Sequence, residues 1–125
     1  PWNRIDAAVL DGLAEAGFEA ISVFGPEKPG PLPAINTHVD IIDWHGARGF
    51  VGEQAALRAA TAHLQARRAG RADAHEATGW LTHHLVHDEA CWSFLARLFE
   101  RTAGDASVVW QRADLLFAGS CRSSP

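Results

Sequence analysis

Short β-branched runs alternate with amphipathic helical segments along this chain, and breaks rich in glycine or proline separate them. The apolar periodicity predicts helices over residues 4–16, 53–69, 88–102 and 113–118. Strand-like runs cover residues 18–24, 35–42, 80–83 and 107–110. Such alternation is typical of α/β proteins with a parallel sheet. Active sites in these folds form where strands hand over to loops at their carboxyl ends.

Capping residues and apolar faces add detail to these helices. Asn3 is placed to cap the first helix and Asp88 to cap the helix over residues 88–102. The buried positions that we expect on the helix over 53–69 are Leu57, Ala60 and Leu64. Those that we expect on the helix over 88–102 are Cys91, Phe94, Leu95 and Leu98.

Composition narrows the class of protein. The 125 residues are 47% hydrophobic and 21% charged, which is enough apolar material for a packed core. The net charge of −4 offers no electrostatic footprint for nucleic acid, and no apolar run is long enough to span a membrane. Cys91 and Cys121 have no metal-ligand spacing and are expected to be free thiols.

The choice of basic residues indicates the kind of organism the protein comes from, and the first residue indicates where the chain begins in the protein. Ten of the 11 basic residues are arginine, as in proteins from GC-rich bacteria. We expect a bacterial protein that is cytoplasmic rather than secreted. The chain begins at Pro1 and has no methionine, so we take its first residue to be an internal position.

A histidine cluster follows the strand-like run at residue 80. His83 and His87 are four residues apart, which would place them on one face only of a helix. In a strand the same gap spans roughly 13 Å, too far for one metal ion. A histidine at a strand end can instead act as a general acid or base, or its ring can be satisfied by the backbone. Asp88 is expected to be a helix cap.

Carboxylates and a tryptophan end the strand-like run at residues 35–42. Asp43 precedes Trp44 at the mouth of a loop, and Asp40 alternates with Ile41. A carboxylate that accepts from an imidazole fixes its tautomer and favours its protonated form. Trp44 could be a platform on which a sugar stacks. The alternatives are a capping aspartate and a half-buried core tryptophan.

Together these segments resemble polysaccharide deacetylases with a NodB-homology domain, a carbohydrate-esterase type. That family has a D-x-x-D-W segment, here residues 40–44, and a later strand ending in L-x-H, here Leu81-Thr82-His83. Pro1-Trp2 corresponds to the end of its R-x-P-aromatic segment. The resemblance implies a distorted (β/α) barrel, of which residues 1–118 form the C-terminal part. Residues 119–125 are expected to be a flexible tail.

The resemblance also implies an activity, the metal-dependent hydrolysis of N-acetyl (or O-acetyl) groups on a bacterial glycan. His83 would be the general acid, Asp43 would orient it, and Trp44 and His84 would contact substrate. The backbone N–H of Trp2 would bind the oxyanion. The family's divalent ion, commonly zinc, is held by residues that would precede Pro1. No metal is therefore expected in this chain alone, which we expect to be inactive by itself.

Three alternatives stay open at this point. His83 is followed by His84, whereas the family pattern has His-Asp, here His87-Asp88. We therefore rank His83 first as the acid, then His84, then His87. The protein could be a non-catalytic relative that binds glycan or acts as a scaffold. It could also be a self-contained α/β domain whose histidine cluster holds its own metal.

Overall fold

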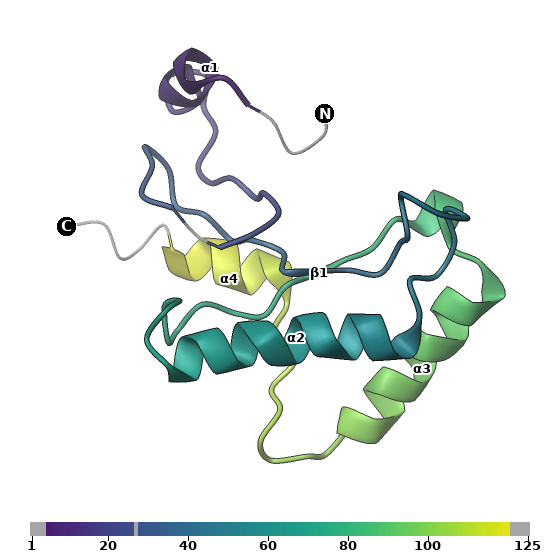
Figure 1. Cartoon of the computed structure of the whole chain (residues 1–125). Coiled ribbons are helices and arrows are strands. Elements are labelled where there is room, and N and C mark those ends of the chain that lie inside the picture. Colours follow the sequence, from purple (N-terminus) through teal and green to yellow (C-terminus); the bar gives the residue numbers. More distant parts are fainter. Residues whose placement is uncertain (1–4, 27, 121–125) are drawn as a thin grey trace.

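The computed structural model describes residues 5–26 and 28–120 (Figure 1). Trp2, Asn3 and Cys121, as well as most of the tail expected over 119–125, lie outside the described residues. The elements are, in order, α1 (Ala7–Gly12), β1 (Val39–Asp40), α2 (Glu53–Arg68), β2 (Trp80–Leu81), the 3₁₀ turn η1 (His84–Val86), α3 (Glu89–Thr102) and α4 (Ala113–Ser120).

Extended segments run side by side through the middle of the molecule. β1 pairs in parallel with β2, with Val39 opposite Trp80 and Asp40 opposite Leu81. The residues that lead into β1 pair with another extended segment, since parallel bridges join Ala34 to Ile21 and Thr37 to Phe24. The strands run in the parallel direction that the alternation of helices and strands predicts. The barrel itself stays a prediction.

Gly79 allows β2 to approach the segment before β1 closely. Its carbonyl accepts hydrogen bonds from the N–H groups of His38, at 2.7 Å, and Val39, at 3.1 Å. A Cβ at residue 79 would collide with the Asn36 carbonyl and would lie 2.8 Å from Thr37 Cα. Because these obstacles are backbone atoms, only glycine fits here without moving one strand away from the other.

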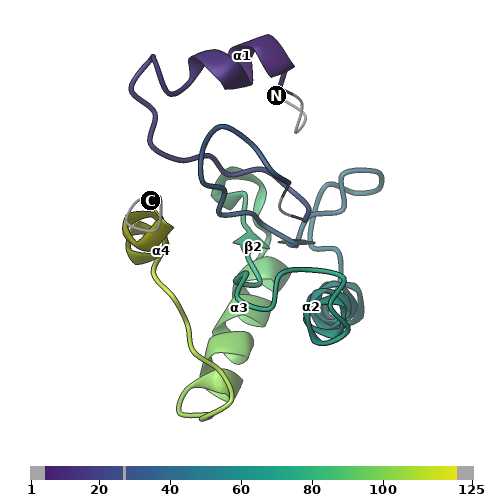
Figure 2. The ribbon, with the colours of Figure 1, turned by 90° about the vertical axis from the view of Figure 1, so that its left-hand side faces the viewer.

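The core lies between the extended segments and the helices α2 and α3, which both lie below those segments in Figures 1 and 2. Apolar side chains of β1, the residues just after it, α2 and α3 fill the core: Val39, Ile41, Ile42, Ala56, Ala60, Cys91, Phe94 and Leu95. The predicted face of α3 is confirmed, with Leu98 packed at its edge. Burial raises the pKa of the Cys91 thiol, so this cysteine behaves as a small apolar residue.

The buried face of α2 differs from the prediction. Ala56, Ala60 and His63 are the buried residues of this helix, whereas Leu57 is 40% and Leu64 46% exposed. Two alanines let the helix come close to β1, and a histidine occupies the third position one turn on. The prediction that Leu57 and Leu64 are buried was wrong because it rested on hydrophobicity alone. The buried face instead needs small side chains next to β1 and a polar partner for His63.

Three other expectations need correction. Helix α1 is shorter than predicted and buries no residue. Its cap is Asp6, whose Oδ1 accepts from the Ala8 N–H at 2.9 Å. Residues 107–110 form no strand, because Asp105 folds the segment into a turn by accepting from the N–H and hydroxyl of Ser107. Helix α4 runs through Ser120, past its expected end.

Among the residues described, no helix combines the length and the apolar character that a membrane crossing would need.

Candidate functional site

The carboxyl ends of β1 and β2 bring together two of the sequence-predicted polar segments. Because the strands are parallel neighbours in register, residues that follow them meet at one edge. Asp40 is the last residue of β1, and His83 follows β2 by two residues. The strand geometry therefore places a carboxylate beside an imidazole although they are 43 positions apart in the chain.

The Asp40–Trp44–His83 cluster is held mainly by the Asp40 carboxylate. Its Oδ2 accepts from the Trp44 indole N–H at 2.8 Å and lies 3.4 Å from His83 Nε2. Its Oδ1 accepts from the Ile42 N–H at 3.0 Å. The rings of Trp44 and His83 meet edge to face, with centroids 4.8 Å apart. The side chains of His83 and Asp40 are 29% and 21% exposed, whereas His83 Nε2 itself is shielded from solvent and lies beside Asp40 without a hydrogen bond of good geometry.

Asp43, which the family resemblance pairs with the catalytic histidine, is hydrogen-bonded to the backbone that follows it. Its Oδ1 accepts from the N–H groups of His45, at 3.2 Å, and Gly46, at 2.9 Å. These bonds close the turn that follows the strand, and a Cβ at Gly46 would collide with the Asp43 carboxylate. The carboxylate that the structure places beside His83 is Asp40, four residues earlier. The Trp44 side chain folds back over those four residues and donates its indole N–H to Asp40.

The other candidate residues near β2 take distinct positions. His84 opens the turn η1 and is exposed. His87 turns inward, and its Nε2 accepts from the His83 N–H at 3.1 Å. Asp88 caps α3 as predicted, since its Oδ1 accepts from the Cys91 N–H at 2.8 Å. Its Oδ2 accepts from the Phe50 N–H at 2.9 Å, and both hydrogen bonds lower the pKa of Asp88.

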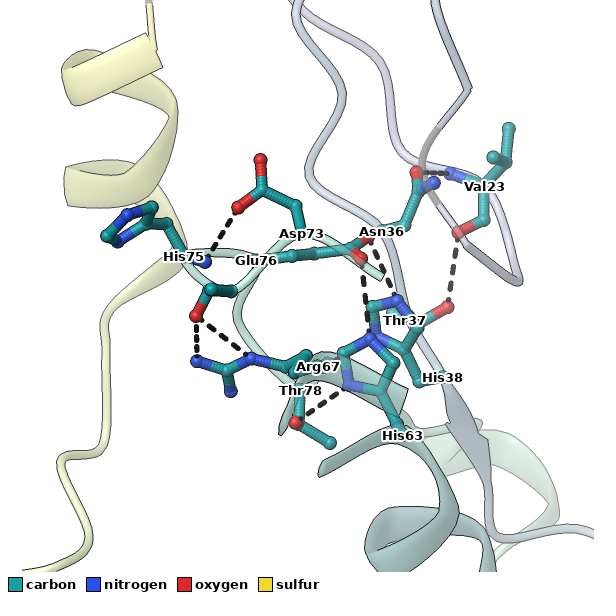
Figure 3. A network of polar contacts seen from close by, with 12 residues as sticks. Val23, Asn36, Thr37, His38, His63, Arg67, Asp73, His75, Glu76 and Thr78 are labelled. Carbon is teal, nitrogen blue, oxygen red and sulfur yellow. Dashed lines mark hydrogen bonds and ion pairs between the residues drawn. The ribbon is translucent and has the colours of Figure 1, made fainter. Parts of the chain in front are cut away.

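A second polar cluster lies at the amino end of β1, where His38 precedes the strand, and it comprises His38, His63 and Glu76. Figure 3 shows these side chains meeting from three separate segments, with Thr78 at the edge. The two oxygens of Glu76 lie 3.0 Å from His38 Nε2 and 3.3 Å from His63 Nε2. His63 Nδ1 lies 2.9 Å from the Thr78 hydroxyl. The three side chains are 4%, 8% and 6% exposed, in the order His38, His63, Glu76.

Hydrogen bonds fix the proton positions in the His38–His63–Glu76 cluster. Gly79 donates its N–H to His38 Nδ1 at 3.1 Å, so neutral His38 must carry its proton on Nε2 and donate it to Glu76. Burial lowers the pKa of His38, and the neighbouring imidazole of His63 lowers it further, although Glu76 opposes part of the shift. The cluster is thus a buried carboxylate that receives a hydrogen bond from each of two imidazoles.

Among the described residues, these three side chains are the candidate ligands for the divalent ion that the resemblance implies. One ligand atom from each lies within 4.8 Å of the others. However, the two imidazoles are stacked, with centroids 3.6 Å apart and planes tilted by 19°. A metal bound by imidazole sits near the ring plane about 2.1 Å from nitrogen, and two nearly parallel planes share no such point. His38 Nε2 also carries a proton where a ligand needs a lone pair, so the cluster does not fit a metal centre.

We expect the purified chain to contain almost no zinc after dialysis against micromolar zinc followed by metal-free buffer. The physical reason is that His38 and His63 cannot direct lone pairs at one point, and His87 Nε2 is occupied by the His83 N–H. Metal analysis by mass spectrometry measures the content. Near-stoichiometric zinc that disappears in His38→Ala or in His83→Ala would contradict this expectation and favour the self-contained metal domain.

Sequence reasoning missed most of the His38–His63–Glu76 cluster. Glu76 lies in a segment whose composition is typical of a polar connector. His63 lies on a helix whose buried face was predicted from its leucines. One signal was available, because His63 follows Ala56 and Ala60 at i+7 and i+3 and so continues the small-residue face of α2. A polar residue on such a face needs a buried partner.

Comparison with known proteins adds no relative, since the chain matches no family model, no curated protein and no solved structure.

Proposed function

We propose that this chain forms the proton-donating side of a polysaccharide-deacetylase-type hydrolase that removes acetyl groups from a bacterial glycan. The observation that carries the proposal is the Asp40–Trp44–His83 cluster at the carboxyl ends of two parallel strands. A carboxylate beside a partly exposed imidazole is the arrangement that general acid catalysis needs. The resemblance supplies the substrate class.

The role of each residue follows from the geometry of the cluster. When water adds to the acetyl carbonyl, the carbon–nitrogen bond of the resulting tetrahedral adduct breaks only if the leaving amine receives a proton. His83 turns Nε2 toward Asp40, so in this proposal Nδ1 is the nitrogen that donates the proton to the leaving group. The Asp40 carboxylate, 3.4 Å from Nε2, would balance the charge of the imidazolium.

Trp44 serves both the acid and the substrate in this proposal. Its indole N–H fixes Asp40, while the residue as a whole stays 41% exposed. An exposed aromatic face beside the acid can stack against a sugar ring and bring the acetamido group toward His83. His84, exposed on η1, contacts the glycan from the neighbouring turn, and the Trp2 backbone N–H would stabilise the oxyanion.

The divalent ion that the resemblance implies has no fitting set of ligands among the described residues, so other residues of the complete protein would hold it. In the complete protein we expect acetate release from N-acetylated oligosaccharides, measured by a coupled acetate assay. Binding of the oligosaccharide without acetate release would favour the second candidate, a non-catalytic glycan-binding relative. The observation that favours this second candidate is the exposure of Trp44 and Trp92.

A further inference from the structure

The imidazole of His87 lies against the backbone of His83. Its Nε2 accepts from the His83 N–H at 3.1 Å, and the His83 carbonyl accepts from the Val86 N–H at 2.8 Å. Both main-chain polar groups of His83 are therefore bonded within their own turn. In a continuing strand they would bond to a neighbouring strand. Two residues after β2 ends, the His87 side chain thus replaces the hydrogen bond that a neighbouring strand would make to the backbone.

This hydrogen bond fixes the proton on His87. Because Nε2 accepts, neutral His87 carries its proton on Nδ1. That atom is shielded from solvent and has no hydrogen-bond partner among the described residues. A shielded N–H without an acceptor is uncommon in folded proteins. The His87 ring therefore leaves its Nδ1 unsatisfied while it presents Nε2 to the His83 N–H.

The ring of His87 is itself held from the side of α3. It meets the Trp92 ring edge to face, with centroids 4.6 Å apart and planes at 72°. Trp92 lies in the first turn of α3, which Asp88 ties to the Phe50 N–H. A chain of contacts thus runs from the start of α3 through Trp92 and His87 to the backbone of His83.

We infer that His87 is a positioning residue, which sets the direction of the His83 side chain through the His83 N–H. The catalytic consequence rests on the proposed function, whereas the hydrogen bond does not. Of the other roles open to His87, metal ligation with His83 would need the lone pair that already accepts the N–H. The role of proton donor would need an N–H that reaches substrate, and His87 Nδ1 is shielded while the ring lies against Trp92.

Two substitutions separate the hydrogen bond from the bulk of the ring. His87→Phe keeps a ring against Trp92 but removes the acceptor, and His87→Gln places a carbonyl oxygen close to the position of Nε2. In the complete protein we expect His87→Phe to lower kcat about 10- to 100-fold with little change in KM, because a small misplacement of an acid has effects of this size. His87→Gln should keep kcat within about threefold of wild type. Equal losses in both variants, or a normal kcat in His87→Phe, would overturn the inference.

A measurement on the chain without substrate makes the inference independent of activity. In long-range ¹H–¹⁵N spectra, neutral His87 should show a protonated Nδ1 and an unprotonated Nε2. The His83 amide should exchange slowly with solvent in wild type and His87→Gln, and faster in His87→Phe. A protonated Nε2 on neutral His87 would overturn the inference. If wild type releases no acetate, the proposed function fails, and the tautomer and exchange results still decide the role of His87.

Discussion

Replacing His83 with alanine in the complete protein should lower kcat for deacetylation by about 10²–10⁴-fold, the usual contribution of a general acid. KM should change little, because the proton is transferred only as the carbon–nitrogen bond breaks. His83 is singled out by its ion-pair distance of 3.4 Å to Asp40 and its contact with Trp44. Steady-state kinetics on an N-acetylated oligosaccharide measure both constants.

His84→Ala tests the neighbouring imidazole, to which the proposal gives a contact with the glycan but no proton transfer. It removes an imidazole from the adjacent position, and the exposed His84 makes no contact with Asp40 that the structure records. We expect its kcat to stay within about tenfold of wild type. A near-normal kcat in His83→Ala, or a larger loss in His84→Ala, would contradict the assignment of His83.

Replacing Glu76 with alanine should lower the free energy of unfolding by about 2–4 kcal/mol, because two buried imidazole N–H groups lose their acceptor together. The loss should also loosen the connector over residues 70–79, which the His38–His63–Glu76 cluster ties to α2 and β1. Urea denaturation followed by circular dichroism measures the change.

Glu76→Gln should be much less destabilising than Glu76→Ala. The amide oxygen can still accept from His38 Nε2, whose tautomer the Gly79 N–H fixes. The amide NH₂ can donate to His63 if that ring moves its proton to Nδ1, where the Thr78 hydroxyl accepts it. Glu100→Ala, on the exposed side of α3, controls for loss of a surface carboxylate and should change stability by less than about 0.5 kcal/mol. Equal destabilisation by alanine and glutamine would refute the proposed proton arrangement.

Elements whose formation is decided locally could be predicted from the sequence. Helix α3 and its Asp88 cap were correct, because the apolar spacing and the cap lie within one short segment. The strand over residues 107–110 was wrong, because a local Asp105–Ser107 turn outweighs strand propensity there. Leu57 and Leu64 misled the assignment of the buried face of α2, since only the tertiary partner shows that alanine and histidine face inward.

The sequence predicted polar residues at the ends of two strands, and the structure brings Asp40, Trp44 and His83 together there. Their part in catalysis stays a prediction. Choosing between Asp40 and Asp43 requires knowing that Asp43 is hydrogen-bonded within the turn and that Trp44 folds back onto Asp40. His38, His63 and Glu76 could not be linked by sequence, because the contacts of Glu76 span 38 and 13 residues.

The central claim, that Asp40 and His83 act as a pair, is tested most directly by comparing kcat for Asp40→Asn and Asp43→Asn in the complete protein. Asp40→Asn removes the charge that faces His83, and we expect a loss of about 100-fold or more. Asp43→Asn keeps an oxygen that can accept from the N–H groups of His45 and Gly46, so its kcat should stay within about threefold of wild type. Circular dichroism of both variants confirms that the fold is retained. The account predicts that only Asp40→Asn loses activity, and a large loss in Asp43→Asn with normal activity in Asp40→Asn would contradict it.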